Sequence, residues 1–162
     1  MWKFMSNGAI IFAGMVSMPA IVTSVDAKLP QKPMIPAVTK TPDPRLSLLQ
    51  KFFESADAPA KEYSHVFLKE ADRNDLDWRL LPSISFVETT GGKAAHNNNL
   101  FGWDCGRAEF KSVTESIRKV AHHLGYAERY RDKDLDEMLW AYNPNPEYSR
   151  RVKSVMERIA PY

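Results

Sequence analysis

The sequence predicts a helix-rich domain, all-α or α+β, behind an exported amino-terminal leader. Apolar residues recur at helical spacing over most of residues 45–162. Glycine and asparagine gather in one stretch, 89–110, which interrupts that pattern and predicts a loop or a small hairpin. Of the 162 residues, 44% are hydrophobic and 26% are charged, so the chain can bury a packed core. We therefore expect one helical domain over residues 45–162 with a small irregular insertion.

Residues 1–27 have the layout of a secretory signal peptide. They contain an early Lys3, an apolar stretch over residues 9–16 and a small-residue cleavage site that ends at Ala27. The apolar stretch is short and is soon followed by Pro19, which argues against a stable membrane span after signal cleavage. We expect an exported protein, in the periplasm, the cell envelope or the medium, with an uncleaved anchor as the alternative.

Residues 28–44 predict an extended spacer, because they contain five prolines and little that could pack. The charges of the remaining chain balance, with 18 Lys and Arg against 18 Asp and Glu over residues 45–162. The whole chain carries only +2, which excludes a dedicated nucleic-acid binder. A neutral domain favours an uncharged or weakly charged ligand, such as a sugar chain.

Cysteine and histidine content exclude two further classes of protein. Cys105 is the only cysteine, so no disulfide scaffold is possible, and we assign Cys105 no role. The four histidines show no spacing typical of metal ligands, so we expect no metal. No glycine pattern of a nucleotide-binding loop occurs, and we expect no organic cofactor. We expect the domain to be a monomer.

Three helices are expected before the insertion. The first places Leu46, Leu49 and Phe53 on one face, and the second runs roughly over residues 59–73. The third begins near Asp77 as N-cap and carries a strongly apolar stripe to its end at Glu88. Pro82 lies five residues past that cap and should distort the early turns without ending the helix.

Three further helices follow the insertion, and each has a clear start signal. Ser112 with Glu115 forms a capping box before a helix that should end at Gly125. The same device recurs with Asp134 and Glu137 ahead of a helix that reaches Tyr142. Asn145 followed by Pro146 opens the last helix, whose inward residues are expected to be Tyr148, Val152, Val155, Met156 and Ile159.

Glu88 is the residue on which general acid chemistry would depend. It ends the third helix on the edge of an apolar stripe, where desolvation raises the pKa of a carboxyl group. The partial negative charge of a helix carboxyl end also disfavours the ionised form. Both effects keep a proton on Glu88 near neutral pH, as a general acid needs. The alternative is a solvated glutamate at a helix end.

Three segments around Glu88 carry a resemblance to a known family. They are 87–92 (VETTGG), 97–103 (NNNLFGW) and 142–148 (YNPNPEY), with Val152 after the last. Together they resemble cell-wall glucosaminidases and lytic transglycosylases of the lysozyme-like superfamily. The Asn-Asn-Leu-Phe-Gly segment looks most like the bacterial endo-β-N-acetylglucosaminidase branch. The resemblance covers roughly residues 76–159.

The resemblance implies a lysozyme-like fold and cleavage of the β-1,4 glycan strand of peptidoglycan or another N-acetylglucosamine-containing glycan. Glu88 and Tyr142 would be catalytic, with the Tyr142 hydroxyl near Glu88 or the substrate acetamido group. Thr89 stands where the family usually has serine and keeps the hydroxyl, so it is expected to be a substrate-binding residue. Two alternatives stay open: a lytic transglycosylase that leaves 1,6-anhydromuramyl ends, and a glycan-binding protein without catalytic activity.

The insertion supplies the remaining candidate residues. The amides of Asn98 and Asn99 either form turns or bind acetamido and hydroxyl groups. Gly102 belongs to the same candidate binding loop. Phe101 is a further substrate-binding candidate whose simpler place is the core, and Trp103 either stacks on a sugar ring or anchors the loop.

A second carboxylate, which most glycosidases use, has two candidates. Asp104 and Glu109 are the acids of the insertion, and each has a surface charge as its simpler interpretation. If neither serves, the N-acetyl group of the sugar could assist.

Overall fold

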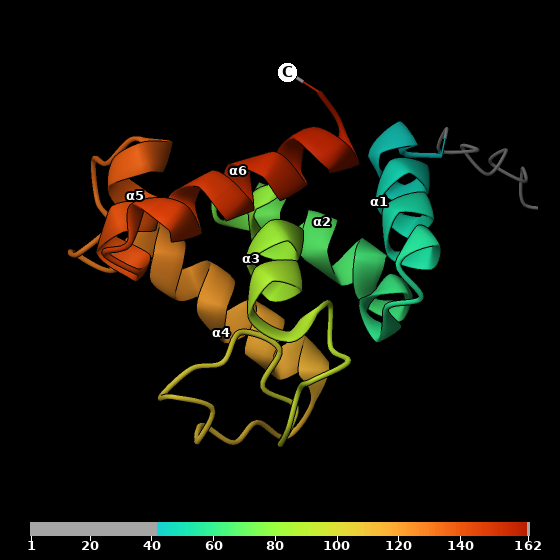
Figure 1. The fold of residues 1–162 in the computed structure, drawn as a ribbon, viewed down its shortest axis with the longest axis horizontal. Helices are drawn as coiled ribbons and strands as arrows, with labels where there is room; N and C mark the ends of the chain where they lie inside the picture. Colours follow the sequence, from blue (N-terminus) through green and yellow to red (C-terminus); the bar gives the residue numbers. More distant parts are fainter. Residues whose placement is uncertain (1–41, 162) are drawn as a thin grey trace, which may run out of the picture. The chain divides into compact units, whose positions relative to one another are not determined.

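A computed structural model describes residues 42–161 of the chain. The described part is helical, with no strand, as Figure 1 shows, and the expected all-α class is confirmed there. Its elements are α1 (Pro44–Ser55), the 3₁₀ helix η1 (Pro59–Tyr63), α2 (Ser64–Arg73), α3 (Leu80–Thr89), α4 (Val113–Tyr126), α5 (Leu135–Tyr142) and α6 (Pro146–Ile159). The predicted signal peptide and all but the end of the predicted spacer lie outside the described residues.

The first two expected helices are present with small differences. The carboxylate of Asp43 caps α1 by accepting from the Arg45 N–H at 2.9 Å, and Pro44 is the first helical residue. The last proline of the predicted spacer is therefore part of the domain, since a proline fits the first turn of a helix, where no amide donor is needed. The expected helix over residues 59–73 is divided into η1 and α2.

The predicted start of α3 was wrong. Asp77 accepts the Arg79 N–H through its carboxylate at 2.9 Å, as an N-cap residue does, but the two residues after it form a turn and the helix begins at Leu80. Pro82 therefore lies in the first turn, where its missing N–H removes no helical hydrogen bond. At this position a proline is not expected to distort the helix, so the distortion predicted for Pro82 does not apply.

Helices α4, α5 and α6 begin where the capping signals predict. Ser112, Asp134 and Asn145 each accept a backbone N–H through the side chain. The capping box of α5 is complete, with both reciprocal bonds to Glu137. At α4 the Glu115 carboxylate binds the preceding Lys111 N–H instead, and the helix continues past the expected glycine to Tyr126.

Helix α3 lies at the centre of the domain and fixes the position of the site (Figure 1). It packs against α6 and α2, and α2 in turn packs against α4. Phe53, Phe67, Leu81, Ile84 and Met156 are at most 1% exposed and belong to one apolar core. Because α3 is held by packing on several sides, its carboxyl end is a firm support for any side chain placed there.

Residues 90–112 form the insertion as a loop built from turns, so of the two expected forms, loop and hairpin, the structure shows the loop. Thr90 ends α3 in the left-handed conformation, with φ of 54°. Gly91 follows with φ of 62°, and a Cβ atom there would lie 2.9 Å from the Cβ of Ala58. The loop begins at the carboxyl end of α3 and leads to α4 (Figure 1).

Among residues 42–161, no helix is sufficiently long and apolar to span a membrane.

Candidate functional site

Glu88 lies in the last turn of α3, half-buried, at the wall of a cavity of about 510 Å³. The cavity opens between the end of α3, the loop, and helices α4 and α5. It is lined by Glu88, Phe101, Gly102, Trp103, Asp104, Cys105, His123, Arg129, Tyr130, Tyr142 and Asn143. Segments far apart in the sequence therefore meet around one carboxylate.

Gly102 forms the part of the wall nearest to that carboxylate. A Cβ atom at this position would lie 3.2 Å from Oε2 of Glu88. The loop backbone thus passes directly beside the carboxyl group, and only a residue without a side chain allows this approach without displacement.

Burial raises the pKa of Glu88 above the ordinary value of a glutamate, because desolvation disfavours its charged form. The Tyr148 hydroxyl and the Arg151 guanidinium oppose the shift, since both stabilise the anion. The raised pKa that the sequence predicted is thus present, and burial is its first cause. A carboxyl group in this state can deliver a proton at higher pH than a solvated glutamate.

Tyr142 and Tyr148 form a stacked pair behind Glu88. Their ring centroids are 5.8 Å apart with 12° between the planes. The Tyr142 hydroxyl donates to the Phe101 carbonyl oxygen at 3.2 Å, which joins α5 to the loop. Burial raises the pKa of both tyrosines, and the nearby Glu88 charge raises it further, so both hydroxyls stay protonated.

The Tyr148 hydroxyl is the one polar atom of this pair without a hydrogen bond of ordinary length to any described residue. The residue is 5% exposed, and its oxygen is buried. It nevertheless lies close enough to the Glu88 carboxylate to stabilise the charged form. The sequence placed Tyr148 in the core and missed this second role, because nothing in the helical pattern shows that one apolar position faces an acid.

Asn99 and Thr89 hold the loop and do not line the cavity. The Asn99 amide accepts from the Trp103 N–H at 3.0 Å and donates to the Trp103 carbonyl at 2.9 Å. The Thr89 hydroxyl binds the Leu100 carbonyl at 2.8 Å, and the residue is 5% exposed. In this structure the polar groups of both side chains are engaged within the loop, and neither side chain is among those that line the cavity.

Asn98 also lies outside the cavity. It is exposed, has a φ of 58° and donates to the Phe110 carbonyl at 2.8 Å. Its turn-forming interpretation is the one that the structure favours. Of the predicted site residues, the structure brings together Glu88, Tyr142, Phe101, Gly102 and Trp103. Phe101 is 1% exposed, as expected of a core residue, and is also part of the cavity lining.

The two candidate second carboxylates differ in position. Asp104 lines the cavity but is exposed, and its carboxylate is paired with Arg107 at 2.7 Å. Glu109 is exposed, does not line the cavity, and contacts the Asn97 amide at 3.4 Å. Asp104 is therefore the only acid besides Glu88 in the described lining.

Sequence reasoning missed the far wall of the cavity. His123, Arg129, Tyr130 and Asn143 line it from α4, from the segment after α4, and from the end of α5. The His123 ring packs edge-on against Trp103 at 5.2 Å and against Tyr130 at 5.4 Å. The aromatic residues after α4 were a signal, but their meeting with Trp103 depends on the tertiary fold.

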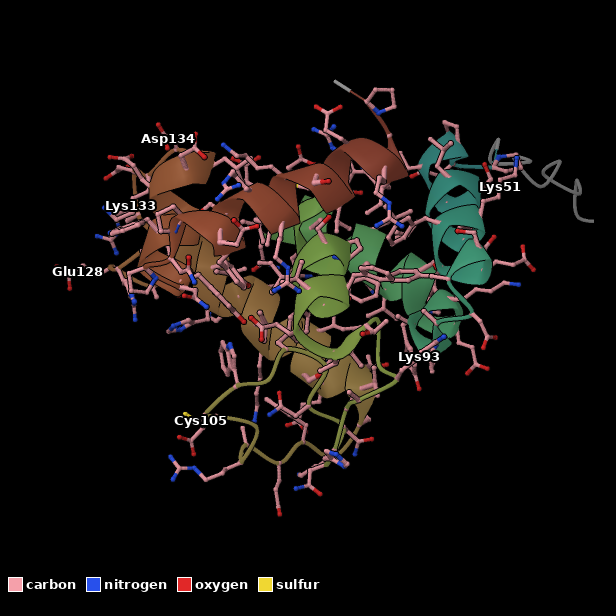
Figure 2. The ribbon with its side chains drawn as sticks, in the orientation of Figure 1. Lys51, Lys93, Cys105, Glu128, Lys133 and Asp134 are labelled. Carbon is pink, nitrogen blue, oxygen red and sulfur yellow. The ribbon has the colours of Figure 1, made fainter. Side chains whose placement is uncertain are left out.

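Cys105 lies at the outer edge of the loop, exposed, as Figure 2 shows. Within residues 42–161 no three His, Cys, Asp or Glu side chains are grouped to hold a metal ion. Comparison of the chain with protein-family models, curated proteins and solved structures found no match. The functional argument therefore depends on the chemistry of the cavity.

Proposed function

We propose that the protein is a peptidoglycan hydrolase with a lysozyme-like fold, an endo-β-N-acetylglucosaminidase that cleaves β-1,4 bonds of the glycan strand. The observation that carries the proposal is the half-buried Glu88 with a raised pKa, placed at the end of a firmly packed helix and open to a cavity. Around it lie an indole and two phenol rings, which suit the apolar faces of pyranose rings.

In the proposed reaction Glu88 gives its proton to the glycosidic oxygen as the bond from that oxygen to C1 of N-acetylglucosamine breaks. The leaving sugar departs as an alcohol. If Asp104 is the base, water adds to C1 and gives its proton to Asp104. If the substrate assists instead, the acetamido oxygen bonds to C1 as the leaving sugar departs, and water then opens that ring while its proton returns to the Glu88 carboxylate. The products are a new reducing end on N-acetylglucosamine and a free hydroxyl on the adjoining sugar.

A lytic transglycosylase is the second candidate, and one observation favours it. Asp104 is exposed and paired with Arg107, so Glu88 is the only buried carboxylate in the described lining. A single carboxyl group suffices when the muramyl 6-hydroxyl replaces water, because Glu88 can first give a proton and then accept one.

Mass spectrometry of digested cell-wall sacculi tests the proposal and separates the two reactions. Reducing N-acetylglucosamine ends support the glucosaminidase. Ends of 1,6-anhydromuramic acid would show transglycosylation instead. Binding to sacculi without any product after long incubation would contradict both and indicate a glycan-binding protein.

A further inference from the structure

A second hollow of about 460 Å³ lies beside the same end of α3, against α6. Phe86, Val87 and Thr90 contribute one wall, and the other comes from one face of α6. Glu88 lines the first cavity while its neighbour Val87 lines the second, so the last turn of α3 borders both hollows.

The second hollow is strongly basic, although the domain as a whole is neutral. The charged side chains that line it are Glu147, Arg150, Arg151 and Arg158. Arg150 is paired with Glu147. Neither Arg151 nor Arg158 has a carboxylate within ion-pair distance anywhere in residues 42–161, and both are exposed.

The two unpaired guanidinium groups are held in place by the protein. Arg158 lies over the rings of Phe52 and Phe86, at 5.4 and 5.5 Å from their centroids. Arg151 donates to the Val87 carbonyl at 3.4 Å, and its charge acts on Glu88. A guanidinium fixed in this way loses little side-chain entropy when it binds an anion, and its planar donors match a carboxylate.

We propose that this hollow is a carboxylate-binding subsite for the short peptides that peptidoglycan strands carry on their muramyl sugars. The inference rests on the proposed function, because it takes the glycan strand through the first cavity and past Glu88. A muramyl residue next to the cleaved bond would then place its peptide over α6, with carboxylates against Arg151 and Arg158. The overall neutrality of the domain, which favoured an uncharged or weakly charged ligand, is compatible with an anionic branch at this one place.

The test compares two soluble glycan substrates, one with its peptides and one from which the peptides have been removed. For the full chain and its variants, the measured quantity is the ratio of kcat/KM on the two substrates. Using the ratio cancels any effect of Arg151 on the proton of Glu88, since that effect applies to both substrates. Arg151→Gln is the main variant, because the Arg151 guanidinium packs over no aromatic ring among the contacts described above. Arg158→Gln would also remove the packing of the guanidinium over the rings of Phe52 and Phe86.

We expect the wild type to prefer the peptide-bearing glycan and Arg151→Gln to reduce that preference about tenfold, the effect of one charged hydrogen bond. Arg158→Gln should reduce it as well. Lys153→Gln is the matched control, because it removes the same charge from α6 at a side chain paired with Asp136 at 2.6 Å. Its ratio should stay at the wild-type value.

Equal cleavage of both substrates by the wild type, or an unchanged ratio in Arg151→Gln, would overturn the subsite and leave the proposed function standing. An equal fall of the ratio in Lys153→Gln would also overturn it, because the effect would then be one of general charge. Failure of the wild type to cleave either substrate would contradict the proposed function itself, and the subsite with it.

Discussion

Gly102 lies so close to Glu88 that a single added carbon would stand 3.2 Å from the carboxylate oxygen Oε2. The glycine also has a φ of 60°, in the left-handed region that side chains disfavour. The loop therefore approaches the acid at a point that no other residue can occupy without moving one of them. Glu88 is enclosed by the loop as well as by the helix that carries it.

Gly102→Ala should lower activity about tenfold or more, because the methyl group pushes the Glu88 carboxylate out of position. The backbone penalty should be about 1–2 kcal/mol. Gly106→Ala separates the two effects, since Gly106 has φ of 81° but no atom within 4 Å of an added Cβ. Initial rates and urea unfolding of both variants check this. Equal activity losses in both would show that backbone strain alone is responsible.

Tyr148→Phe should move the alkaline limb of the pH–activity profile to higher pH. The Tyr148 hydroxyl lowers the pKa of Glu88, so its removal raises that pKa and keeps the acid protonated further into the alkaline range. Stability should fall at pH values above the pKa of Glu88, where the hydroxyl stabilises the anion, and should stay unchanged where the carboxyl is protonated. Tyr126→Phe, at a ring that is 56% exposed, is the control. An unmoved limb would exclude the coupling between Tyr148 and Glu88.

Wild-type activity should be highest on the acidic to neutral side and fall as pH rises through the raised pKa of Glu88, since the acid must hold its proton. Initial rates on soluble glycan from about pH 4 to 9 measure this limb. An acidic limb appears only if a base such as Asp104 takes part. Full activity at the alkaline end would remove Glu88 from the role of general acid.

Glu88→Gln should make the folded domain more stable than wild type at neutral pH. The folded pKa of Glu88 lies above its unfolded value, so wild type loses stability as pH rises through that interval, and a neutral amide does not. Below the unfolded pKa of about 4.3 the carboxyl is protonated in both states, and the gain should vanish. Thermal unfolding of wild type and Glu88→Gln, measured at neutral pH and again below the unfolded pKa, checks this difference in stability. A gain independent of pH would contradict the burial of the charge.

Asn99→Ala should destabilise the domain by about 1–3 kcal/mol, because it leaves the backbone groups of Trp103 without the partners they have in the fold. Activity should fall as well, since Trp103 lines the cavity. Asn97→Ala is the comparison, at an exposed residue whose amide makes only a 3.4 Å contact; its φ of 51° adds a backbone penalty for alanine, and its total loss should still be smaller than that of Asn99→Ala. Urea unfolding of the two variants measures the difference. Equal unfolding midpoints would contradict the role given to the Asn99 amide.

Helices were predictable because their signals are local. The caps at Ser112, Asp134 and Asn145 stand where the sequence placed them, and the apolar stripes they precede face the core. The start of α3 was not predictable from Asp77, because its carboxylate accepts an N–H two residues on, as Asp43 does, yet a turn lies between it and the helix. A cap signal shows that a side chain can bind a nearby amide, and it does not fix the first residue of the regular helix.

The site was predictable only in part, for a related reason. Glu88 could be singled out by its place at a helix end, and Tyr142 only through the family resemblance; both line the cavity. Thr89 and Asn99 have polar groups suited to a ligand. In the structure, however, these groups form hydrogen bonds to backbone groups of the loop. Tyr148 and Arg151 lie near Glu88 because α6 packs against α3. This contact between two helices cannot be predicted from a local sequence pattern.

The most direct test of the central claim is the rate at which purified Glu88→Gln digests cell-wall sacculi, measured beside Glu109→Gln. The amide keeps the shape of the side chain and removes the acid, while Glu109 is an exposed acid of the loop that does not line the cavity. We predict a loss of about 10²–10⁴-fold for Glu88→Gln and a wild-type rate for Glu109→Gln. Undiminished digestion by Glu88→Gln would contradict the assignment of Glu88 as the general acid.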